Sequence, residues 1–461
     1  MFTTEFASHV PLPTHRFPAD FRWGVATSAF QIEGAADVDG KGPSIWDTFC
    51  RRPGVIADGS DGTVACEHYH RLDADLDLIA SLGVDAYRFS IAWPRVRPTG
   101  AGDWNEAGLA FYDRLIDGLN ARGIQPHLTL NHWDLPEALQ ATGGWADRAT
   151  VQRFVDYALG IAARYGRRVA AITTHNEPWV MAVLGHEAGI FAPGIRDRAI
   201  AAQVAHHLLL SHGLAVRAMR AAGCSVPMGI VLNLSPTVPA TDSAADRARA
   251  LLEDGRLLRW YMDPLFHGRY PVDILDDLGE QAPVIEPGDL DAISVPIDFL
   301  GINYYTRSVA SAGAPWVPGS SGLPLTDMGW EVHAPSLTEL LLRLARDYPV
   351  PPLTITENGG AFPDACIDGR VADHDRTEYL AGHIAAVGEA MRQGVPVNGY
   401  FVWSLMDNFE WASGYAKRFG IVHVDYTTQV RTPKASAHWY RRFLQHQQAL
   451  RASALGIPTG D

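Results

Sequence analysis

Short strand-like runs alternate with helical patterns along the whole chain, and this alternation restricts the fold more than any other feature of the sequence. Eight runs have the composition of strands: 21–30, 86–93, 125–133, 170–178, 227–235, 298–306, 353–359 and 397–405. Parallel neighbours in a sheet need long crossover connections, which helices usually supply. Eight strand–helix repeats therefore predict an α/β fold whose parallel sheet closes into a single (β/α)8 TIM barrel.

Two of the intervening segments carry a clear helical period. Residues 105–123 predict a helix with Asn105 as its N-cap and Gly123 just past its end, and residues 67–83 predict another that ends at Gly83. Apolar side chains recur at helical spacing in both: Leu109, Tyr112, Leu115, Ile116 and Leu119 in the first, and Leu72, Leu76, Ile79 and Leu82 in the second.

Nothing in the sequence marks a domain boundary, because no Pro/Ser linker, low-complexity tract or charge block interrupts the 461 residues. We expect one barrel domain over 1–461, with short flexible tails at about 1–15 and 447–461. Four connections are too long for simple turns: 31–70, 179–200, 233–298 and 306–336. They predict elaborated loops, partly helical as in 244–263, mainly on the C-terminal face where such barrels build their sites.

The net charge and the cysteine content indicate which kinds of partner and which cell compartment to expect. The net charge of −14 disfavours a nucleic acid or an anionic membrane, and no run of 18 apolar residues predicts a membrane span. The four cysteines form no CxxC pair and no Cys/His spacing of a zinc site. The N-terminal residues also lack the basic start and apolar run of a signal peptide, so we expect a cytoplasmic protein.

Two glutamates stand where predicted strands end. The stretch LTITENGG leads from a strand into Glu357 and then into Asn-Gly-Gly, and Glu177 ends the fourth run before Pro178, which cannot continue a ladder. Strands 4 and 7 lie roughly across the mouth of such a barrel from one another. A lone strand-end glutamate is usually an ordinary loop acid, but a pair there suits glycosidic bond cleavage, which needs one protonated and one ionised carboxyl.

Two motifs around these acids give the chain its resemblance to glycoside hydrolase family 1, specifically its β-glucosidases, from about Phe17 to Phe443. Thr174–Pro178 resembles the family's T-x-N-E-P motif, and Ile355–Gly359 resembles its I/V-T-E-N-G motif. The resemblance implies a retaining exo-β-glucosidase with Glu177 as acid/base and Glu357 as nucleophile. It implies a covalent glycosyl-enzyme, terminal β-D-glucosyl residues of β-glucosides or cello-oligosaccharides as substrates, and no metal or other cofactor.

Arg88 alternates with Tyr87, Phe89 and Ile91 in YRFSIAW. If those three face the helices, Arg88 points into the barrel and needs a carboxylate partner. The resemblance implies that this partner is Glu357, which Arg88 would keep ionised with a low pKa. A purely structural buried ion pair is the alternative.

Polar and aromatic residues near the strand ends suit a pyranose, which offers hydroxyls at its rim and C–H groups on its faces. By resemblance, five residues would bind the glycone hydroxyls: Gln31, His132, Asn176, Glu410 and Trp411. Asn176 would contact the 2-hydroxyl. Tyr305 would sit beside Glu357, Trp403 under the sugar ring and Trp330 on the aglycone side. Asn303 and Trp133 are expected to support this set.

Related activities are separated by single positions. Relatives that act on 6-phosphorylated sugars replace the Glu410-Trp411 pair with small and basic residues, and those that cleave thioglucosides have Gln at the acid/base, so a plain β-glycosidase is expected. His175 departs from the usual motif, and we attach no function to it. A β-galactosidase, β-fucosidase or transglycosidase with the same pocket is left open, as is a homo-oligomer. A non-catalytic sugar-binding barrel is disfavoured, because such relatives usually lack one of the two carboxylates and both are present here. A metal-dependent hydrolase is disfavoured, because the 18 histidines include no HExxH zinc motif.

Overall fold

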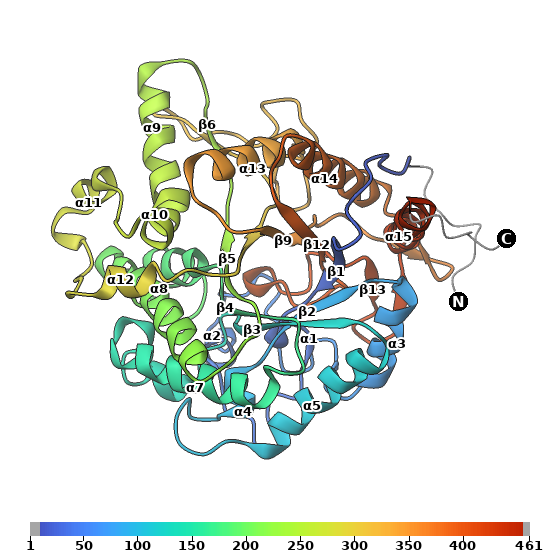
Figure 1. Ribbon diagram of the computed structural model, residues 1–461, viewed down its shortest axis with the longest axis horizontal. Coiled ribbons are helices and arrows are strands. Elements are labelled where there is room, and N and C mark those ends of the chain that lie inside the picture. Colours follow the sequence, from blue (N-terminus) through green and yellow to red (C-terminus); the bar gives the residue numbers. More distant parts are fainter. Residues whose placement is uncertain (1–9, 455–461) are drawn as a thin grey trace.

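A computed structural model describes residues 10–454 and confirms the predicted barrel. Eight parallel strands close in the order β1-β12-β9-β7-β5-β4-β3-β2. Their bounds are β1 Arg22–Ala26, β2 Ala86–Ser90, β3 Gln125–Asn131, β4 Ala171–Asn176, β5 Met228–Asn233, β7 Phe299–Asn303, β9 Leu353–Asn358 and β12 Val397–Trp403. Each predicted run contains one of these strands, and Figure 1 shows them at the centre of a ring of helices.

The helices of the ring pack their apolar faces on the outside of the strands. The longest are α3 Leu72–Leu82, α5 Glu106–Ala121, α7 Ala149–Tyr165, α8 Arg198–Ala221, α13 Pro335–Asp347, α14 His374–Arg392 and α15 Ala435–Ala454. Gly83 ends α3 with φ +77°, a left-handed conformation that favours glycine. Asn105 is the N-cap residue of α5, but its side chain does not cap the helix, because its Nδ2 donates to the backbone oxygens of Asp39 and Arg95 instead.

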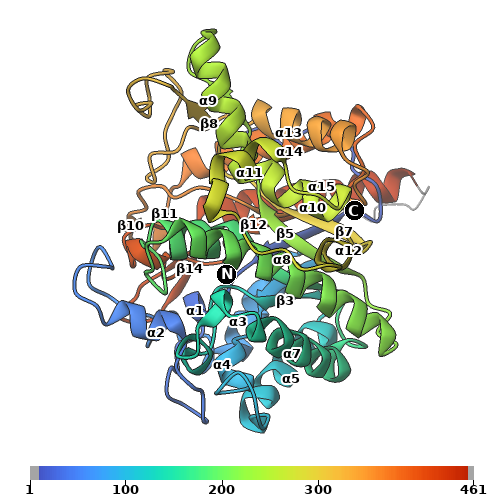
Figure 2. The ribbon, with the colours of Figure 1, turned by 90° about the vertical axis from the view of Figure 1, so that its left-hand side faces the viewer.

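Insertions enlarge the C-terminal side of the barrel, as the long connections predicted. After β4 comes the π-helix η3 (Val180–Glu187), and after β7 comes the short strand β8 (Ser308–Ala310). The longest insertion follows β5 and holds β6 Thr237–Pro239, α9 Ala244–Asp254, the π-helix η4 Gly255–Arg259, α10 Trp260–His267, α11 Val272–Leu278 and α12 Asp289–Ile293. β6 pairs in parallel with β8, and α9 projects beyond the ring of helices (Figures 1 and 2).

Four short helices complete the connections: α1 Ala29–Ile32, α2 Ile45–Cys50, α4 Trp93–Val96 and α6 Glu137–Gln140. Two-stranded ribbons form from β10 Cys366–Ile367 with β11 Arg370–Val371, and from β13 Val422–Val424 with β14 Arg431–Pro433. Helix α1 brings Gln31 to the mouth of the barrel. The segment between β12 and β13 carries Glu410 and Trp411.

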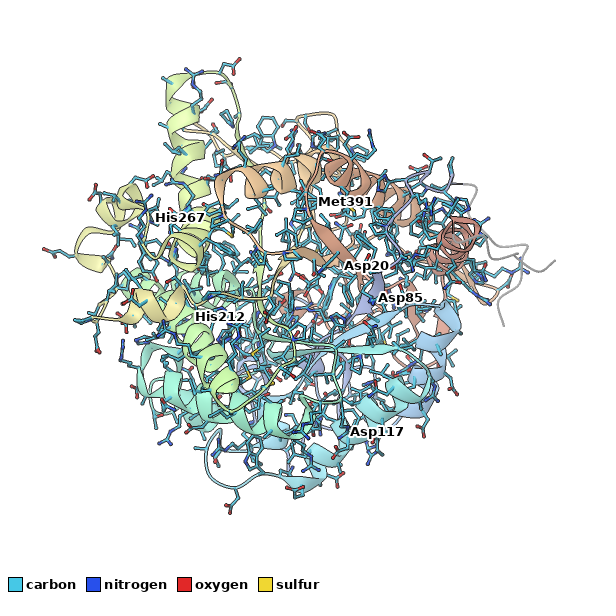
Figure 3. All side chains as sticks on the ribbon, viewed as in Figure 1. Asp20, Asp85, Asp117, His212, His267 and Met391 are labelled. Atoms are coloured by element: carbon cyan, nitrogen blue, oxygen red, sulfur yellow. The ribbon has the colours of Figure 1, made fainter. Side chains whose placement is uncertain are left out.

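Helix α8 supports the strand that ends in the acidic motif. His212, labelled on this helix in Figure 3, is fully buried, and its Nδ1 lies 2.7 Å from Thr174 Oγ1 on β4. Within residues 10–454, α8 is the one helix long and apolar enough to cross a membrane, and 78% of its apolar window is buried inside the protein.

The ends of the chain correct one expectation. Residues 447–454 belong to α15, and Gln447 is 1% exposed, with its Nε2 donating to His15 O and its Oε1 accepting from Phe17 N. These contacts hold His15 and Gln447 together within the fold, so the tails predicted at about 1–15 and 447–461 were too long. Their remaining parts, 1–9 and 455–461, lie outside the described residues.

Candidate active site

The C-terminal ends of β4 and β9 bring Glu177 and Glu357 to one cavity, as predicted. Glu177 follows Asn176 directly and has φ +49°, an uncommon conformation for a residue other than glycine. This turn at the strand end, before Pro178, directs the chain away from the ladder. Glu357 is 3% exposed and Glu177 is 6% exposed.

A chain of hydrogen bonds joins the two acids. Arg88 Nη1 donates to Glu357 Oε1 at 2.6 Å, and its Nη2 donates to Asn176 Oδ1, also at 2.6 Å. Asn303 Nδ2 donates to Asn176 Oδ1 at 3.0 Å and to Glu177 Oε1 at 2.5 Å. Arg88 therefore points into the barrel, as the alternation in its strand predicted, and its partner is Glu357, as the family resemblance implied.

The surroundings of the two carboxyls shift their pKa values differently. Burial, and then the charge of Glu357, raises the pKa of Glu177 to about 8. Burial also raises the pKa of Glu357, whereas Arg88 and then the Tyr305 hydroxyl lower it. Glu357 has both a cation and a phenol as direct partners, so it is the acid of the pair that loses its proton first. The low pKa expected for Glu357 from Arg88 alone is not found, because the carboxyl is so deeply buried.

Tyr305 lies beside Glu357, as predicted, and its hydroxyl donates to Glu357 Oε2 at 2.5 Å. Each oxygen of Glu357 thus has its own donor, Arg88 on one side and Tyr305 on the other. The Tyr305 ring also contacts Trp330, with 5.5 Å between ring centroids. Trp330 thus lies next to Tyr305 in the lining of the cavity.

Aromatic rings surround His132 in the lining of the cavity. Its ring is almost parallel to those of Trp403 and Trp411, at 17° to each and with centroids 5.8 and 6.0 Å away. Burial, and then Arg88, lowers the pKa of His132 far below its usual value, so the imidazole is neutral. Its Nε2 accepts from Asn176 Nδ2 at 3.2 Å, which leaves the proton on Nδ1. Trp133 Nε1 donates to Asn176 O.

Gln31 reaches the site from α1 and connects it to Glu410. Its Nε2 donates to Phe409 O at 2.9 Å and lies 3.5 Å from Glu410 Oε2, and its Oε1 accepts from Ser28 Oγ. Burial, and then the charge of Glu357, raises the pKa of Glu410 to about 8. Glu410 and Gln31, which the resemblance implied as two partners of the glycone, therefore lie next to each other.

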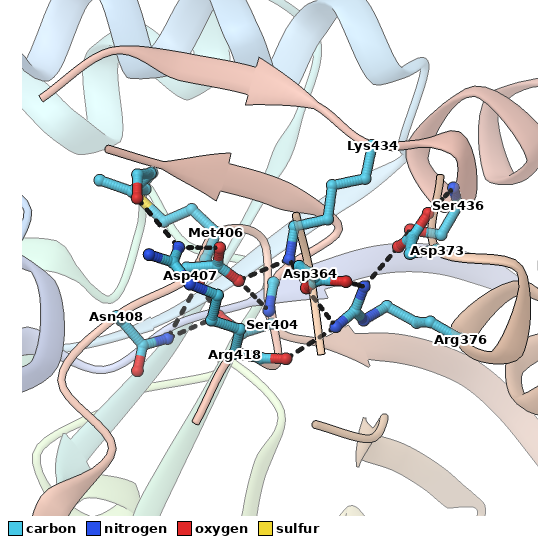
Figure 4. A network of polar contacts seen from close by, with 12 residues as sticks. Asp364, Asp373, Arg376, Ser404, Met406, Asp407, Asn408, Arg418, Lys434 and Ser436 are labelled. Carbon is cyan, nitrogen blue, oxygen red and sulfur yellow. Dashed lines mark hydrogen bonds and ion pairs between the residues drawn. The ribbon is translucent and has the colours of Figure 1, made fainter. Parts of the chain in front are cut away.

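Behind this unit lies a buried network of charges (Figure 4). Lys434 Nζ lies between Asp364 Oδ2 at 2.5 Å and Asp407 Oδ1 at 2.6 Å, and all three side chains are completely buried. Asn408, next to Asp407, accepts from Gln31 Nε2 at 3.0 Å. The network stabilises the segment that carries Glu410. It could not be predicted from the sequence, because Asp364, Asp407 and Lys434 are far apart along the chain.

The cavity has a volume of about 460 Å³. Ten of the residues predicted for the site line it: His132, Trp133, Glu177, Asn303, Tyr305, Trp330, Glu357, Trp403, Glu410 and Trp411. Gln31, Asn176 and Arg88 are not among its lining residues and contact the lining ones from behind. In the described part of the chain, no three His, Cys, Asp or Glu side chains are arranged to hold a metal ion.

The outer part of the cavity is mostly apolar and was not predicted residue by residue. Its lining includes Trp179, Leu184, Phe191, Leu257 and Trp316, which come from the inserted segments. The cationic side chain in the lining is Arg307, which pairs with Glu331 at 2.9 Å. His175 lies away from the cavity lining. It stacks on Phe154 and contacts Ser211 and Asn131, so it belongs to the core around β4.

Comparisons with known proteins show which family the chain belongs to. A β-glucosidase of Agrobacterium sp. is 47% identical over 454 residues, which cover 97% of each chain. A bifunctional β-D-glucosidase/β-D-fucosidase of Bifidobacterium breve is 43% identical over 94% of this chain and 99% of its own. The solved family 1 β-glucosidase of Thermotoga maritima with isofagomine lactam superposes with a TM-score of 0.91, at 43% identity, over 94% of this chain and 99% of that one. The profile of Glycosyl hydrolase family 1 matches residues 13–449, and the chain belongs to this family.

Proposed function

We propose that the protein is a retaining exo-β-glucosidase that removes terminal β-D-glucosyl residues from the non-reducing ends of its substrates. The observation that carries the proposal is the pair Glu177 and Glu357, which face one cavity in different electrostatic surroundings. One acid that holds its proton and one that ionises first are what a glycosidase needs.

In the first step Glu177 gives its proton to the glycosidic oxygen while Glu357 attacks the anomeric carbon. The bond from the anomeric carbon to the leaving oxygen breaks as the bond to a Glu357 oxygen forms, which yields a covalent glycosyl-enzyme. In the second step Glu177, now ionised, takes a proton from a water that attacks the same carbon and releases Glu357. This sequence requires carboxyl groups about 5–5.5 Å apart.

The glycone is proposed to lie against Trp403, with Glu410 and Trp411 at its rim. Gln31 and Asn176, which lie behind the lining residues, are proposed to reach its hydroxyls when the sugar binds. The Nδ1 proton of His132 offers one further donor to a hydroxyl, since no described residue accepts from it. Glucose is the sugar favoured by the resemblance. β-Fucosides or β-galactosides and transglycosylation remain the second candidates, and the Bifidobacterium breve relative named for both glucosidase and fucosidase activity supports testing fucosides.

On the aglycone side, Trp330 and the apolar residues of the inserted segments suit aryl or alkyl groups. A second groove of about 260 Å³ shares Trp179, Leu257 and Ser308 with the cavity and is lined by the paired side chains Arg256 and Glu187. Groups of both signs suit neutral hydroxyls, so this groove supports cello-oligosaccharides as substrates. The kcat/KM for cellotriose is expected to be higher than that for cellobiose.

The two-step mechanism is tested by the anomer released first. Proton NMR of a β-glucoside digest should show β-glucose before mutarotation, whereas initial α-glucose would mean inversion. A 2-deoxy-2-fluoro glucoside with a good leaving group should label Glu357, as read by mass spectrometry of the digested protein. A label on Glu177 would mean that the two roles are exchanged.

We also propose a cytoplasmic location, which the four unpaired cysteines Cys50, Cys66, Cys224 and Cys366 support. Fractionation of the source cells, followed by assay of each fraction, tests this.

A further inference from the structure

The amide of Asn303 is held in one orientation by groups on both of its ends. Its oxygen accepts from Thr356 Oγ1 at 2.7 Å, and its nitrogen donates to Glu177 Oε1 at 2.5 Å and to Asn176 Oδ1 at 3.0 Å. Asn303 is 1% exposed and Thr356 is 3% exposed, so water does not compete for these bonds. Glu177 therefore faces a donor and not an acceptor.

An irregularity in the sheet brings the Thr356 hydroxyl to this position. The pairing of β7 with β9 runs Ile302 to Ile355 and then Asn303 to Glu357, so Thr356 is an extra residue on β9. Such bulges re-aim side chains and are common beside active sites. Gly301 leaves the space that the threonine occupies, because a Cβ there would lie 2.9 Å from Thr356 Cγ2 and 3.0 Å from its Oγ1.

We propose that Thr356 is a positioning residue, whose hydroxyl holds the Asn303 amide so that its nitrogen faces the Glu177 carboxyl. An asparagine amide can turn over, and the hydroxyl secures the orientation by donating to the oxygen. Asn176 fixes the nitrogen end of the Asn303 amide. Arg88 donates to Asn176 Oδ1, so this oxygen is the atom that faces Asn303 and accepts from its Nδ2. The proposal rests on the proposed role of Glu177 as acid/base.

A donor at Glu177 stabilises its ionised form, which the second step of the reaction uses as a base. The other titratable or charged groups around this carboxyl are Glu357 on β9, Arg88 on β2, Tyr305 after β7 and Glu410 after β12, with neutral His132 behind Asn176. Glu357 and Glu410 disfavour the charge on Glu177 and Arg88 favours it. Loss of the Asn303 donor therefore leaves the carboxyl more reluctant to ionise.

The test is the pH dependence of kcat/KM in Thr356→Val, which keeps the shape of the side chain and removes the hydroxyl. The basic limb, where Glu177 loses its proton in the free enzyme, should move to higher pH by about half a unit to one unit. Thr356→Ser should restore the wild-type limb. Thr356→Ala, which avoids any strain from the second methyl of valine, should repeat the shift.

Thr354→Val is the matched control. Thr354 lies on the same strand, and its Oγ1 donates to Asn398 Oδ1 at 2.7 Å, so the same kind of bond is lost away from the site. This variant should keep the wild-type profile. In an Asn303→Ala background, Thr356→Val should cause no additional shift, because the threonine acts through the asparagine.

Two results would overturn the proposal: a basic limb unmoved in both Thr356→Val and Thr356→Ala, or a full shift that persists in the Asn303→Ala background. Glu177→Gln, assayed with an activated aryl glucoside, separates the proposed role of Thr356 from the proposed role of Glu177 as acid/base. The limb should vanish in that variant. A basic limb that remains in Glu177→Gln would refute the acid role of Glu177. If the limb vanishes in Glu177→Gln but is unmoved in the Thr356 variants, only the role of Thr356 is refuted.

Discussion

Arg88 and Glu357 form a buried ion pair in which one guanidinium serves two partners: Nη1 donates to Glu357 and Nη2 donates to Asn176. The planar guanidinium can hold both at once, whereas a lysine ammonium is a compact charge on a flexible stem. The pair thus sets the ionisation of Glu357 and the orientation of Asn176 together.

Arg88→Lys should therefore lower kcat/KM by about 10- to 100-fold, the usual worth of a hydrogen bond to a charged group. The pKa of Glu357 should rise further, so the acidic limb of the pH profile should move to higher pH. Kinetics with an aryl β-glucoside between pH 4 and 9 measure both effects. An acidic limb at the wild-type position would contradict the assignment of that limb to Glu357.

Glu177→Ala removes the proton donor. With poor leaving groups such as alkyl alcohols or glucose, the rate of the first step should fall by about 10²–10⁴-fold, the contribution typical of general acid catalysis. Glycosides with acidic phenols should lose much less in that step, because their leaving oxygen needs little help from a proton. Pre-steady-state bursts with a series of phenols separate the two cases. An equal loss across the series would argue against an acid role.

The parts of the site that the sequence could predict are those fixed by the strand ends. Residues at the C-terminal ends of barrel strands lie at the opening, so Glu177 and Glu357 could be placed from the strand pattern. Arg88 could be placed from the alternation within its strand, which points it into the barrel. The register irregularity that puts Thr356 against Asn303 could not, because it depends on how β7 and β9 pair. The same holds for Lys434, which meets Asp364 and Asp407 only after the chain has folded.

The boundaries of the fold show the same limit. The apolar period predicted α5 and α3, and Asn105 is the N-cap residue of α5 as expected. Its side chain does not cap the helix, however, because it bonds to Asp39 and Arg95 across the fold. The residues that line the outer cavity, such as Trp179 and Trp316, come from insertions without a repeating pattern. Their positions depend on tertiary packing, which a pattern of residues along one segment does not contain.

Glu410 should make the site selective against 6-phosphorylated sugars. Its carboxyl, next to Trp411, contacts the Gln31 amide, and the cation in the cavity lining, Arg307, is already paired with Glu331. A phosphate dianion at this rim would meet an acid and no free cation among the described lining residues. The kcat/KM for p-nitrophenyl β-glucoside should exceed that for its 6-phosphate, and the reverse order would refute this prediction.

Asp134 carries a pH dependence of stability that is separate from catalysis. It is 1% exposed, and neither of its carboxyl oxygens has a hydrogen-bond partner among the described residues. Burial, and then the charge of Glu33, raises its pKa to about 8. Because the folded pKa lies above the unfolded one, the unfolded chain binds fewer protons between about pH 4 and 8, and stability falls as the pH rises through this window.

Asp134→Asn removes this proton linkage without losing a hydrogen bond. Relative to the wild type, its free energy of unfolding should rise by about 2.6 kcal/mol between pH 5 and pH 7, since a linked proton is worth about 1.4 kcal/mol per pH unit. Urea denaturation at the two pH values measures this. Asp364→Asn is the control, because the pKa of Asp364 is shifted in the opposite direction. Arg376 and Lys434 outweigh burial and lower this pKa, so Asp364 is ionised in both the folded and the unfolded protein between pH 5 and pH 7. Its penalty, about 3–5 kcal/mol for a broken buried pair, should be the same at pH 5 and pH 7. If Asp134→Asn also shows a constant difference from the wild type, Asp134 is ionised in the folded protein and the prediction is wrong.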